Sequence, residues 1–280
     1  MLERAESNCV TIIPTFEDNF CYVVEYSPGN ALLIDPAEPS KVWPVVSQMP
    51  LKITHIMATH HHWDHSGGNN EMVKLLKERG EEKVEVVGGR KDAVEGKTIS
   101  VGDVDELELG KFKVSFLETP GHTNGHICYY FDSADETMVF TGDCLFVGGC
   151  GKFFEGSADE MFGSFMKLAV LPRSTLVYVG HEYTISNYSF ATKAVQTDAV
   201  AARAQWAAEK RANGEFTVPS TIGDEIDSNV FMMAVLEKEG VNGGVWGGFL
   251  TKCGCAAGSS FLPAELLGKV REAKDKNLLK

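Results

Sequence analysis

The stretch Thr59–His65, THHHWDH, holds four of the eight histidines in this chain of 280 residues. His60 and His62 are two positions apart, a spacing that directs both side chains to the same side just past the end of a strand. Asp64 and His65 are adjacent and can serve a second centre a few ångströms away. Neutral imidazole and carboxylate are the usual ligands of zinc and iron. The stretch therefore predicts a metal site, and two ions would need further ligands from elsewhere in the chain.

Strand-like segments surround this stretch. Residues 53–60 (ITHIMATH) predict a buried strand that ends at the histidines, and residues 69–80 predict a helix that stops at Gly80. A short helix is predicted over residues 42–49. Runs of β-branched and aromatic residues predict further strands at 9–16, 21–26, 31–35, 84–89, 106–110, 111–120, 126–131, 137–143 and 175–181.

The pattern changes near residue 185, where alanine-rich helical segments replace the strands. Helices are predicted at 191–215, within 219–240 after a loop, and at 264–277. Residues 241–260 are rich in glycine and predict a loop. We therefore expect a mixed β/α domain over residues 1–184 and an all-helical domain over residues 185–280.

The composition argues against several classes of protein. The formal net charge is −13 and the pI is about 5.1, which does not suit nucleic acid as the main partner, because a phosphate-binding surface is normally basic. The N-terminus has early acidic residues and no apolar core, so we expect no signal peptide. No run of about 18 apolar residues predicts a membrane span. The seven cysteines are scattered and odd in number, which favours reduced thiols and a cytoplasmic location.

Three more candidate ligands follow strands later in the chain. His122 lies in TPGHTNGH, Asp143 in FTGD and His181 in VGHEY, each directly after a predicted strand. Loops at strand ends gather into sites, so these side chains can join the histidine cluster. The two oxygens of Asp143 could bridge two ions.

Together these motifs resemble the metallo-β-lactamase superfamily, which carries H-x-H-x-D-H and then a His, an Asp and a final His on separate loops. Within it, the chain resembles the glyoxalase II, or hydroxyacylglutathione hydrolase, family. The stretches that carry the resemblance are T-H-H-H-W-D-H-S-G-G-N, G-H-T-x-G-H-I-C-Y, F-T-G-D-x-L-F-V-G-G-C-G-K-F-F-E-G, G-H-E-Y-T and V-P-S-T. They cover roughly residues 9–233, and the resemblance fades over residues 235–262.

The resemblance implies an α+β fold, an αββα sandwich of two sheets followed by a small all-helical domain that binds substrate. It also implies two divalent metal ions, zinc first, although the same ligands accept iron or manganese. By position, the first ion is held by His60, His62 and His122, the second by Asp64, His65 and His181, and Asp143 bridges them.

The activity implied is the hydrolysis of S-2-hydroxyacylglutathione thioesters, from S-lactoylglutathione to D-lactate and glutathione, in methylglyoxal detoxification. Two ions that share a water lower its pKa from about 15.7 to about 7, and the hydroxide attacks the thioester carbonyl. Asp64 and Asp143 are the expected catalytic residues. Cys144 beside Asp143 could suggest covalent catalysis, but a reactive thiol needs a base and an exposed position. The expected partner is the small thioester, bound by a monomer without nucleic acid or membrane.

Five residues are candidates for binding the substrate. In the family, a lysine in G-K-F-Y-E-G and the tyrosine of H-E-Y contact the thiol, and these match Lys152 and Tyr183. The family tyrosine two places after the lysine is Phe154 here, which removes a hydroxyl donor and leaves another thiol carrier as an alternative. An arginine and a lysine three apart near the C-terminus match Arg271 and Lys274. The three basic residues could instead be ordinary solvated side chains.

Other polar residues near the motifs have supporting interpretations. Asp35 ends a strand and is expected to orient a ligand imidazole, or to cap a turn. His61 lies between two ligands and should point away from the first metal. His55 and His126 fit the core or a structural hydrogen bond better than a metal.

Two rival functions fit part of the sequence. A persulfide dioxygenase of the same fold with a single iron shares H-x-H-x-D-H, but the full set of seven ligands and H-E-Y-T favour the hydrolase. A metal-binding scaffold without catalysis is opposed by the intact ligand set and by Lys152 and Tyr183. A β-lactamase or a ribonuclease of this fold fits less well, because the chain is acidic and carries the helical tail.

Overall fold

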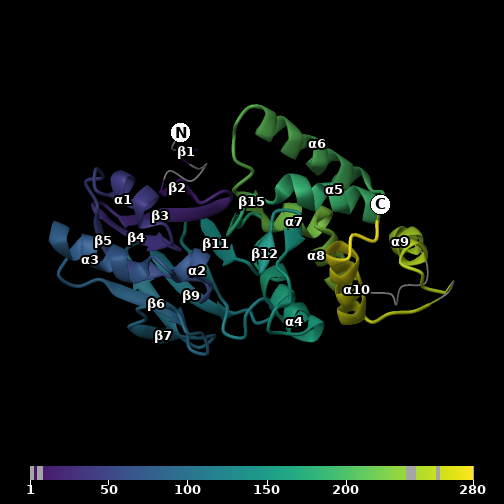
Figure 1. The fold of residues 1–280 in the computed structure, drawn as a ribbon, viewed down its shortest axis with the longest axis horizontal. Coiled ribbons are helices and arrows are strands. Elements are labelled where there is room, and N and C mark those ends of the chain that lie inside the picture. The colour runs from purple at the N-terminus through teal and green to yellow at the C-terminus, as the bar shows by residue number, and fades with distance from the viewer. Residues whose placement is uncertain (1–2, 5–8, 238–243, 257–258, 280) are drawn as a thin grey trace.

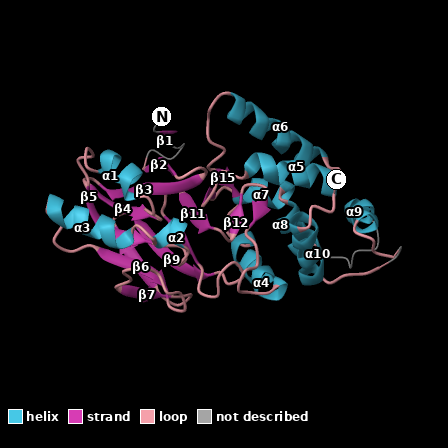
Figure 2. Cartoon of the chain, viewed as in Figure 1, coloured by secondary structure: helices cyan, strands magenta, loops and turns pink. Residues whose placement is uncertain are grey.

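Two β-sheets and a group of helices make up the molecule. The structure, a computed structural model, describes residues 3–4, 9–237, 244–256 and 259–279. The sheets lie face to face, and the later helices gather at one end of the sandwich beside the second sheet (Figure 1). Figure 2 shows the strands in one part of the molecule and α5–α10 in the other.

The first sheet follows chain order. Its strands pair antiparallel from β1 to β4 and parallel from β4 to β7. The strands are β1 (Glu3–Arg4), β2 (Val10–Thr15), β3 (Asn19–Ser27), β4 (Asn30–Ile34), β5 (Lys52–Met57), β6 (Glu85–Gly89) and β7 (Ile99–Val101).

The second sheet has the order β15-β14-β11-β10-β9-β8, and only β11 and β14 pair parallel within it. Its strands are β8 (Glu106–Leu109), β9 (Phe112–Glu118), β10 (Ile127–Asp132), β11 (Thr137–Gly142), β14 (Leu176–Val179) and β15 (Ser220–Thr221). A separate small hairpin joins β12 (Leu145–Phe146) to β13 (Gly149–Cys150).

Alternation along each strand builds the layers. In β3, Tyr22 and Val24 face the core shared with the second sheet, whereas Cys21 and Val23 face the opposite side. Tyr22 crosses the interface between the sheets, and its hydroxyl donates to the carbonyl of Val179 at 2.6 Å. Both faces of the first sheet are therefore buried, one under the second sheet and one under helices.

Helices cover the outer faces. Apolar side chains of α1 and α3, such as Val46 and Leu76, pack on the outer face of the first sheet, and those of α4 join the core of the second. As predicted, α3 stops at Gly80, whose φ of 114° suits glycine. These helices are α1 (Pro39–Val46), α2 (Trp63–Ser66), α3 (Asn69–Arg79) and α4 (Ala158–Ala169). The αββα expectation is confirmed.

The later part of the chain is helical, apart from β15, which joins the second sheet as an edge strand. Its elements are α5 (Thr184–Ala194), α6 (Asp198–Ala212), α7 (Ile222–Ser228), α8 (Val230–Val235), η1 (Gly244–Trp246), α9 (Gly247–Lys252) and α10 (Pro263–Asp275). No helix in the described ranges is both long and apolar enough to cross a membrane. The boundary between a mixed β/α domain and a helical domain at residues 184 and 185 stays a prediction.

Two predictions for this part are wrong. Residues 191–215 do not form one helix, because Val195 is extended and the Thr197 hydroxyl caps a new helix by accepting from the amide of Val200 at 3.3 Å. Within 241–260, the predicted loop contains η1 and α9. Their glycines are held in helical form because Trp246 and Phe249 are buried, and such packing overrides weak helix propensity. Residues 241–243 and 257–258 lie outside the described residues.

Three helices hold the β12–β13 hairpin in place. Side chains of Asn187 on α5, Glu225 on α7 and Asn229 on the N-terminus of α8 hydrogen-bond to the backbone of residues 146–149 at 2.9–3.2 Å. Glu225 is fully buried, and burial raises the pKa of its carboxyl. The helical part therefore fixes the position of a hairpin that belongs to the earlier part of the chain.

We expect Asn229→Ala to lower the stability of the protein. The substitution removes the donor that two carbonyls of the hairpin and the Glu225 carboxylate share, and an unsatisfied buried polar group costs about 1–3 kcal/mol. Thermal unfolding should shift down by about 2–4 °C for each kcal/mol. Asn213→Ala, at an exposed position, is the control and should leave the melting temperature unchanged. Equal melting temperatures of the two variants would contradict the role of Asn229.

Candidate metal site and adjoining pocket

Seven side chains that follow strands of both sheets meet in one place. The loop after β5 and helix α2 provide four of them, and the loops after β9, β11 and β14 provide one each. They are His60, His62, Asp64, His65, His122, Asp143 and His181, the full set predicted as ligands. We call them the main cluster.

One half of the main cluster contains His60, His62 and His122. The Nδ1 atom of His62 lies 3.0 Å from Nε2 of His60 and 3.0 Å from Nε2 of His122. Ligand bonds of about 2.0–2.1 Å in a tetrahedral zinc site place neighbouring ligand atoms about 3.3–3.4 Å apart. The three nitrogens are thus close to the spacing that one ion requires.

The other half contains Asp64, His65 and His181. Nε2 of His65 lies 3.2 Å from Nε2 of His181, and Oδ2 of Asp64 lies 3.6 Å from the latter atom and 3.8 Å from the former. These distances also fit the edges of a coordination shell. Three ligands of mixed nitrogen and oxygen type suit a second divalent ion.

Asp143 lies between the two halves. Its Oδ2 atom is 3.4 Å from Nε2 of His122, and its Oδ1 atom is 3.3 Å from Nε2 of His65 and 3.4 Å from Nε2 of His181. Oδ1 is buried and has no hydrogen-bond partner among the described residues. A buried oxygen of this kind is costly unless something positive satisfies it, so the geometry fits a bridging carboxylate.

The charges of the main cluster differ between its halves. Burial lowers the pKa of His122 to about 4 and that of His60 far below its usual value, so both rings are neutral lone-pair donors at pH 7. Burial alone would lower the pKa of His65 too, but the carboxylates of Asp143 and Asp35 raise it to about 9. His65 therefore holds a proton that a divalent ion would displace on binding.

Three of the imidazoles are oriented by a contact at the ring nitrogen that faces away from the cluster. Nδ1 of His65 donates to Asp35 at 2.9 Å, Nδ1 of His122 to the carbonyl of Lys152 at 2.9 Å, and Nδ1 of His181 to Asp18. Such contacts fix the tautomer and leave the Nε2 lone pair directed at the cluster.

Asp35 holds more than one part of the site. Its oxygens also accept from the amide and the hydroxyl of Thr59, both at 2.7 Å, so one buried carboxylate links the start of the histidine stretch to His65. Its φ of 49° lies in the left-handed region, which aspartate tolerates better than most residues.

Two supporting residues were not identified from the sequence. Asp18 lies 2.8 Å from Nδ1 of His181, and the side-chain amide of Asn19 donates to Oδ2 of Asp64 at 3.2 Å. Asp18 ends the turn between β2 and β3, and Asn19 is the first residue of β3. In the sequence, they could have been found by their position between two predicted strands, because the predicted ligands also lie in segments that follow strands.

The three histidines outside the main cluster make hydrogen bonds with other residues. His126 is fully buried, its Nδ1 pairs with the hydroxyl of Thr119 at 2.8 Å, and its Nε2 accepts from the amide of Asp143 at 3.2 Å. His61 points away from the main cluster and contacts the buried carboxylate of Asp92. Nδ1 of His55 forms a hydrogen bond with the hydroxyl of neighbouring Thr54 at 2.8 Å.

Glycines allow the backbone to approach the ligands closely. A Cβ atom at Gly180 would lie 2.5 Å from Oδ1 of Asp143, and one at Gly151 would lie 2.1 Å from the carbonyl oxygen of Asp143. Any other residue at these positions would push the carboxylate out of place. The glycines that precede His181 and Lys152 in the motifs are therefore required by close packing against Asp143.

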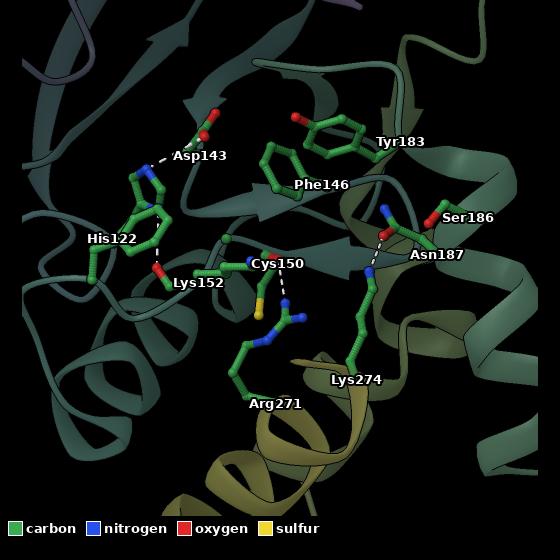
Figure 3. Close-up of a pocket in the computed structure, with 12 residues that line it drawn as sticks. His122, Asp143, Phe146, Cys150, Lys152, Tyr183, Ser186, Asn187, Arg271 and Lys274 are labelled. Atoms are coloured by element: carbon green, nitrogen blue, oxygen red, sulfur yellow. Dashed lines mark hydrogen bonds and ion pairs between the residues drawn. The ribbon is translucent and has the colours of Figure 1, made fainter. Parts of the chain in front are cut away.

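A pocket of about 350 Å³ opens beside the main cluster, with His122 and Asp143 in its wall. Figure 3 shows these two residues on one side and Arg271 and Lys274, from α10, on another. The structure thus brings all five substrate candidates into one cavity, which is lined by Lys152, Phe154, Tyr183, Arg271 and Lys274.

The three basic residues of the pocket differ in their exposure to solvent. Arg271 is buried, donates to the carbonyl of Cys150 at 2.9 Å and pairs with Asp275 at 2.9 Å. Lys274 contacts the side chain of Asn187, and burial, together with the charge of Arg271, lowers its pKa to about 8. Lys152 is exposed. The pocket therefore concentrates positive charge in a chain whose net charge is −13.

Aromatic rings line the passage from the pocket to the main cluster. Tyr183 stacks on His181 with ring centroids 4.6 Å apart and planes at 6°, and Phe146 meets Tyr183 edge-on at 5.2 Å. Phe154 is 63% exposed and lies 5.2 Å from His122. Its ring therefore offers an apolar contact where the family pattern has a hydroxyl.

Two family models together match nearly the whole chain. One, described as the metallo-beta-lactamase superfamily, matches residues 14–181, and one described as the hydroxyacylglutathione hydrolase C-terminus matches residues 182–277.

Similar proteins extend this match. A hydroxyacylglutathione hydrolase of Arabidopsis thaliana, named as cytoplasmic, is 38% identical over 269 residues, which cover 94% of this chain and 96% of the relative. A hydroxyacylglutathione hydrolase of Dictyostelium discoideum is 36% identical over 272 residues, 93% of this chain and 96% of the relative. Among solved structures, ETHE1 from Myxococcus xanthus superposes with a TM-score of 0.54 at 24% identity over 82% of each chain, a likeness of fold.

We expect Asp35→Asn to weaken divalent-metal binding by about 10–100-fold. The amide can still accept from Thr59, but its NH₂ group faces Nδ1 of His65, which then loses its acceptor. Metal affinity is measured by competition with a chromophoric chelator. Asp227→Asn, which changes an exposed carboxylate, is the control. If both variants bind metal as the wild type does, Asp35 has no part in orienting the ligand.

Proposed function

The chain belongs to the hydroxyacylglutathione hydrolase family of the metallo-β-lactamase superfamily, and we propose that it hydrolyses S-2-hydroxyacylglutathione thioesters, converting S-lactoylglutathione to D-lactate and glutathione in methylglyoxal detoxification. The observation that carries this proposal is a basic pocket whose wall includes two members of the main cluster, His122 and Asp143. An anionic thiol can lie in the pocket while its thioester carbonyl reaches the cluster.

The main cluster is proposed to hold two divalent ions, zinc first. His60, His62 and His122 would bind one ion and Asp64, His65 and His181 the other, with Asp143 shared between them. The Oδ1 atom of Asp143, which accepts no hydrogen bond from the described residues, and the 3.0–3.8 Å spacings support this assignment. When bound there, the ions supply an acidified water and polarise the thioester carbonyl.

The residues of the chain prepare the cluster for this chemistry. Asp35, Asp18 and the carbonyl of Lys152 each accept the Nδ1 proton of a ligand histidine, so the Nε2 atoms stay directed inward through the reaction. His126 holds the backbone amide of Asp143. Because these contacts exist before substrate arrives, little reorganisation is needed as charge develops on the carbonyl oxygen.

The pocket is proposed to hold the glutathione half of the substrate. Glutathione carries carboxylates, and Lys152, Arg271 and Lys274 supply positive charge for them. The side chain of Tyr183, at the junction of pocket and cluster, can contact the sulfur. Residues 1–184 would thus perform the hydrolysis and residues 185–280 would complete the thiol site.

A covalent route through cysteine is opposed by burial. Cys144 follows Asp143 directly but is fully buried, with its sulfur 3.8 Å from that of Met161. The hydrogen bond that the Cys144 thiol donates to Cys128 and burial both raise the pKa of the Cys144 thiol. A thiol in this state is a poor nucleophile.

The location and assembly state complete the proposal. The relative from Arabidopsis thaliana is named as cytoplasmic, which supports a cytoplasmic location for this chain. We propose that the protein acts as a monomer, in which one chain supplies the main cluster and the pocket.

The proposal is tested by steady-state kinetics with lactoyl thioesters of glutathione and of other cellular thiols, with metal content measured on the same sample. We expect the highest kcat/KM with glutathione, because the cationic pocket matches its carboxylates, and about two divalent ions per chain. A higher kcat/KM with another thiol would reassign the substrate. Oxygen consumption with glutathione persulfide and a single iron would replace the hydrolase with a dioxygenase.

We expect Lys152→Ala to raise KM with little change in kcat, because the side chain would bind the substrate and take no part in the bond-breaking step. Metal content should be unaffected, since the Lys152 carbonyl that accepts from His122 remains. Lys152→Arg keeps the positive charge and is the matched control. An unchanged KM in Lys152→Ala would remove Lys152 from the binding site.

A further inference from the structure

A second group of potential ligands lies at the rim of the main cluster. His61, His62 and Glu155 each place one ligand atom within 4.8 Å of the others. The side chains of His61 and Glu155 are 30% and 34% exposed, so ions in solution can reach them. Among these three residues, only His62 belongs to the main cluster.

The spacing within this group suits a metal better than an ordinary ion pair. Nε2 of His61 lies 3.4 Å from Oε1 of Glu155. Charge-assisted hydrogen bonds between nitrogen and oxygen are about 2.7–2.9 Å long, whereas ligand atoms around a tetrahedral zinc ion lie about 3.3–3.4 Å apart. The same spacing occurs in the main cluster, where Nε2 of His122 lies 3.4 Å from Oδ2 of Asp143.

Neighbouring residues hold both new ligands in place. The buried carboxylate of Asp92 contacts Nδ1 of His61 and also accepts from the hydroxyl of Thr123 at 2.9 Å. Because a carboxylate only accepts, Nδ1 is the nitrogen of His61 that donates to Asp92, and Nε2 is the nitrogen that faces Glu155. The other oxygen of Glu155 accepts from the amide of Asn124 at 2.8 Å. A histidine backed by a carboxylate is the usual arrangement of metal-binding imidazoles.

We propose that His61, His62 and Glu155 form an accessory site for a zinc-like divalent cation, with water completing its coordination shell. Two nitrogens and one carboxylate oxygen are a ligand set that zinc accepts, and an exposed position leaves room for water. His61 then has a ligand role of its own, outside the main cluster.

The accessory site shares His62 with the main cluster, a consequence that rests on the metal assignment proposed above. Nδ1 of His62 faces His60 and His122 at 3.0 Å. An accessory ion that binds His62 competes with the main cluster for this imidazole. The accessory site therefore binds more weakly, and excess zinc inhibits the protein.

The test counts bound ions directly. Wild type, Glu155→Gln and the control Glu78→Gln are dialysed against rising zinc concentrations, and bound zinc is measured by elemental analysis. Glutamine keeps an oxygen for the amide of Asn124 and removes the charge, while Glu78 is an exposed glutamate on α3. We expect one ion beyond the main complement in wild type and control, and at least about tenfold weaker binding of that ion in Glu155→Gln.

Two results would overturn the proposal: no additional ion in the wild type, or an additional ion bound equally well by Glu155→Gln. His61→Asn provides a second variant, which should lose the same ion and keep the main complement. Thioesterase inhibition by excess zinc should weaken in parallel with the loss of the ion. Because zinc is counted whether or not a thioester is cleaved, failure of the accessory site is distinguishable from failure of the proposed function.

Discussion

The arrangement of the surrounding side chains depends on the buried carboxylate of Asp143. Its two oxygens face two different groups of imidazoles, and Oδ1 accepts no hydrogen bond from the described residues. A buried charge is tolerated only when it is paired. Burial would raise the pKa of Asp143, but His181 and His65 hold it well below its usual range. Asp143 is therefore a buried negative charge that a cation must balance.

The fold satisfies this constraint by bringing strand ends of both sheets to one place. The first sheet delivers four ligands after β5, and the second delivers three after β9, β11 and β14. Glycine at positions 151 and 180 lets the backbone approach Asp143 more closely than any side chain would allow. The supporting carboxylates of Asp18 and Asp35 then fix the imidazoles at their outer nitrogens. His65 and His181 are thus each held at the nitrogen that faces away from the cluster.

The seven converging side chains could be predicted because each lies in a segment that follows a predicted strand, whereas the αββα sandwich was implied by the resemblance to the metallo-β-lactamase superfamily. The sequence predicts the supporting residues poorly. Asp18, Asp92 and Glu155 belong to loops that lie far from their partners in the chain, so their contacts could not be read from the sequence. The helix over Gly247–Lys252 was predicted as a loop because its stability comes from burial of Phe249 and not from its glycines. Arg271 and Lys274 had the right spacing, yet only tertiary structure brings them to the pocket.

The pocket wall joins parts of the chain that are made at different times. The ligands of the main cluster all lie between residues 60 and 181, whereas Arg271, whose guanidinium meets the carbonyl of Cys150, follows 121 residues after its partner. On a ribosome, the sandwich can emerge and gather its ligands while α10 has yet to be synthesised. The proposed metal site can then form before the proposed thiol pocket, which is complete only after α10 has been made.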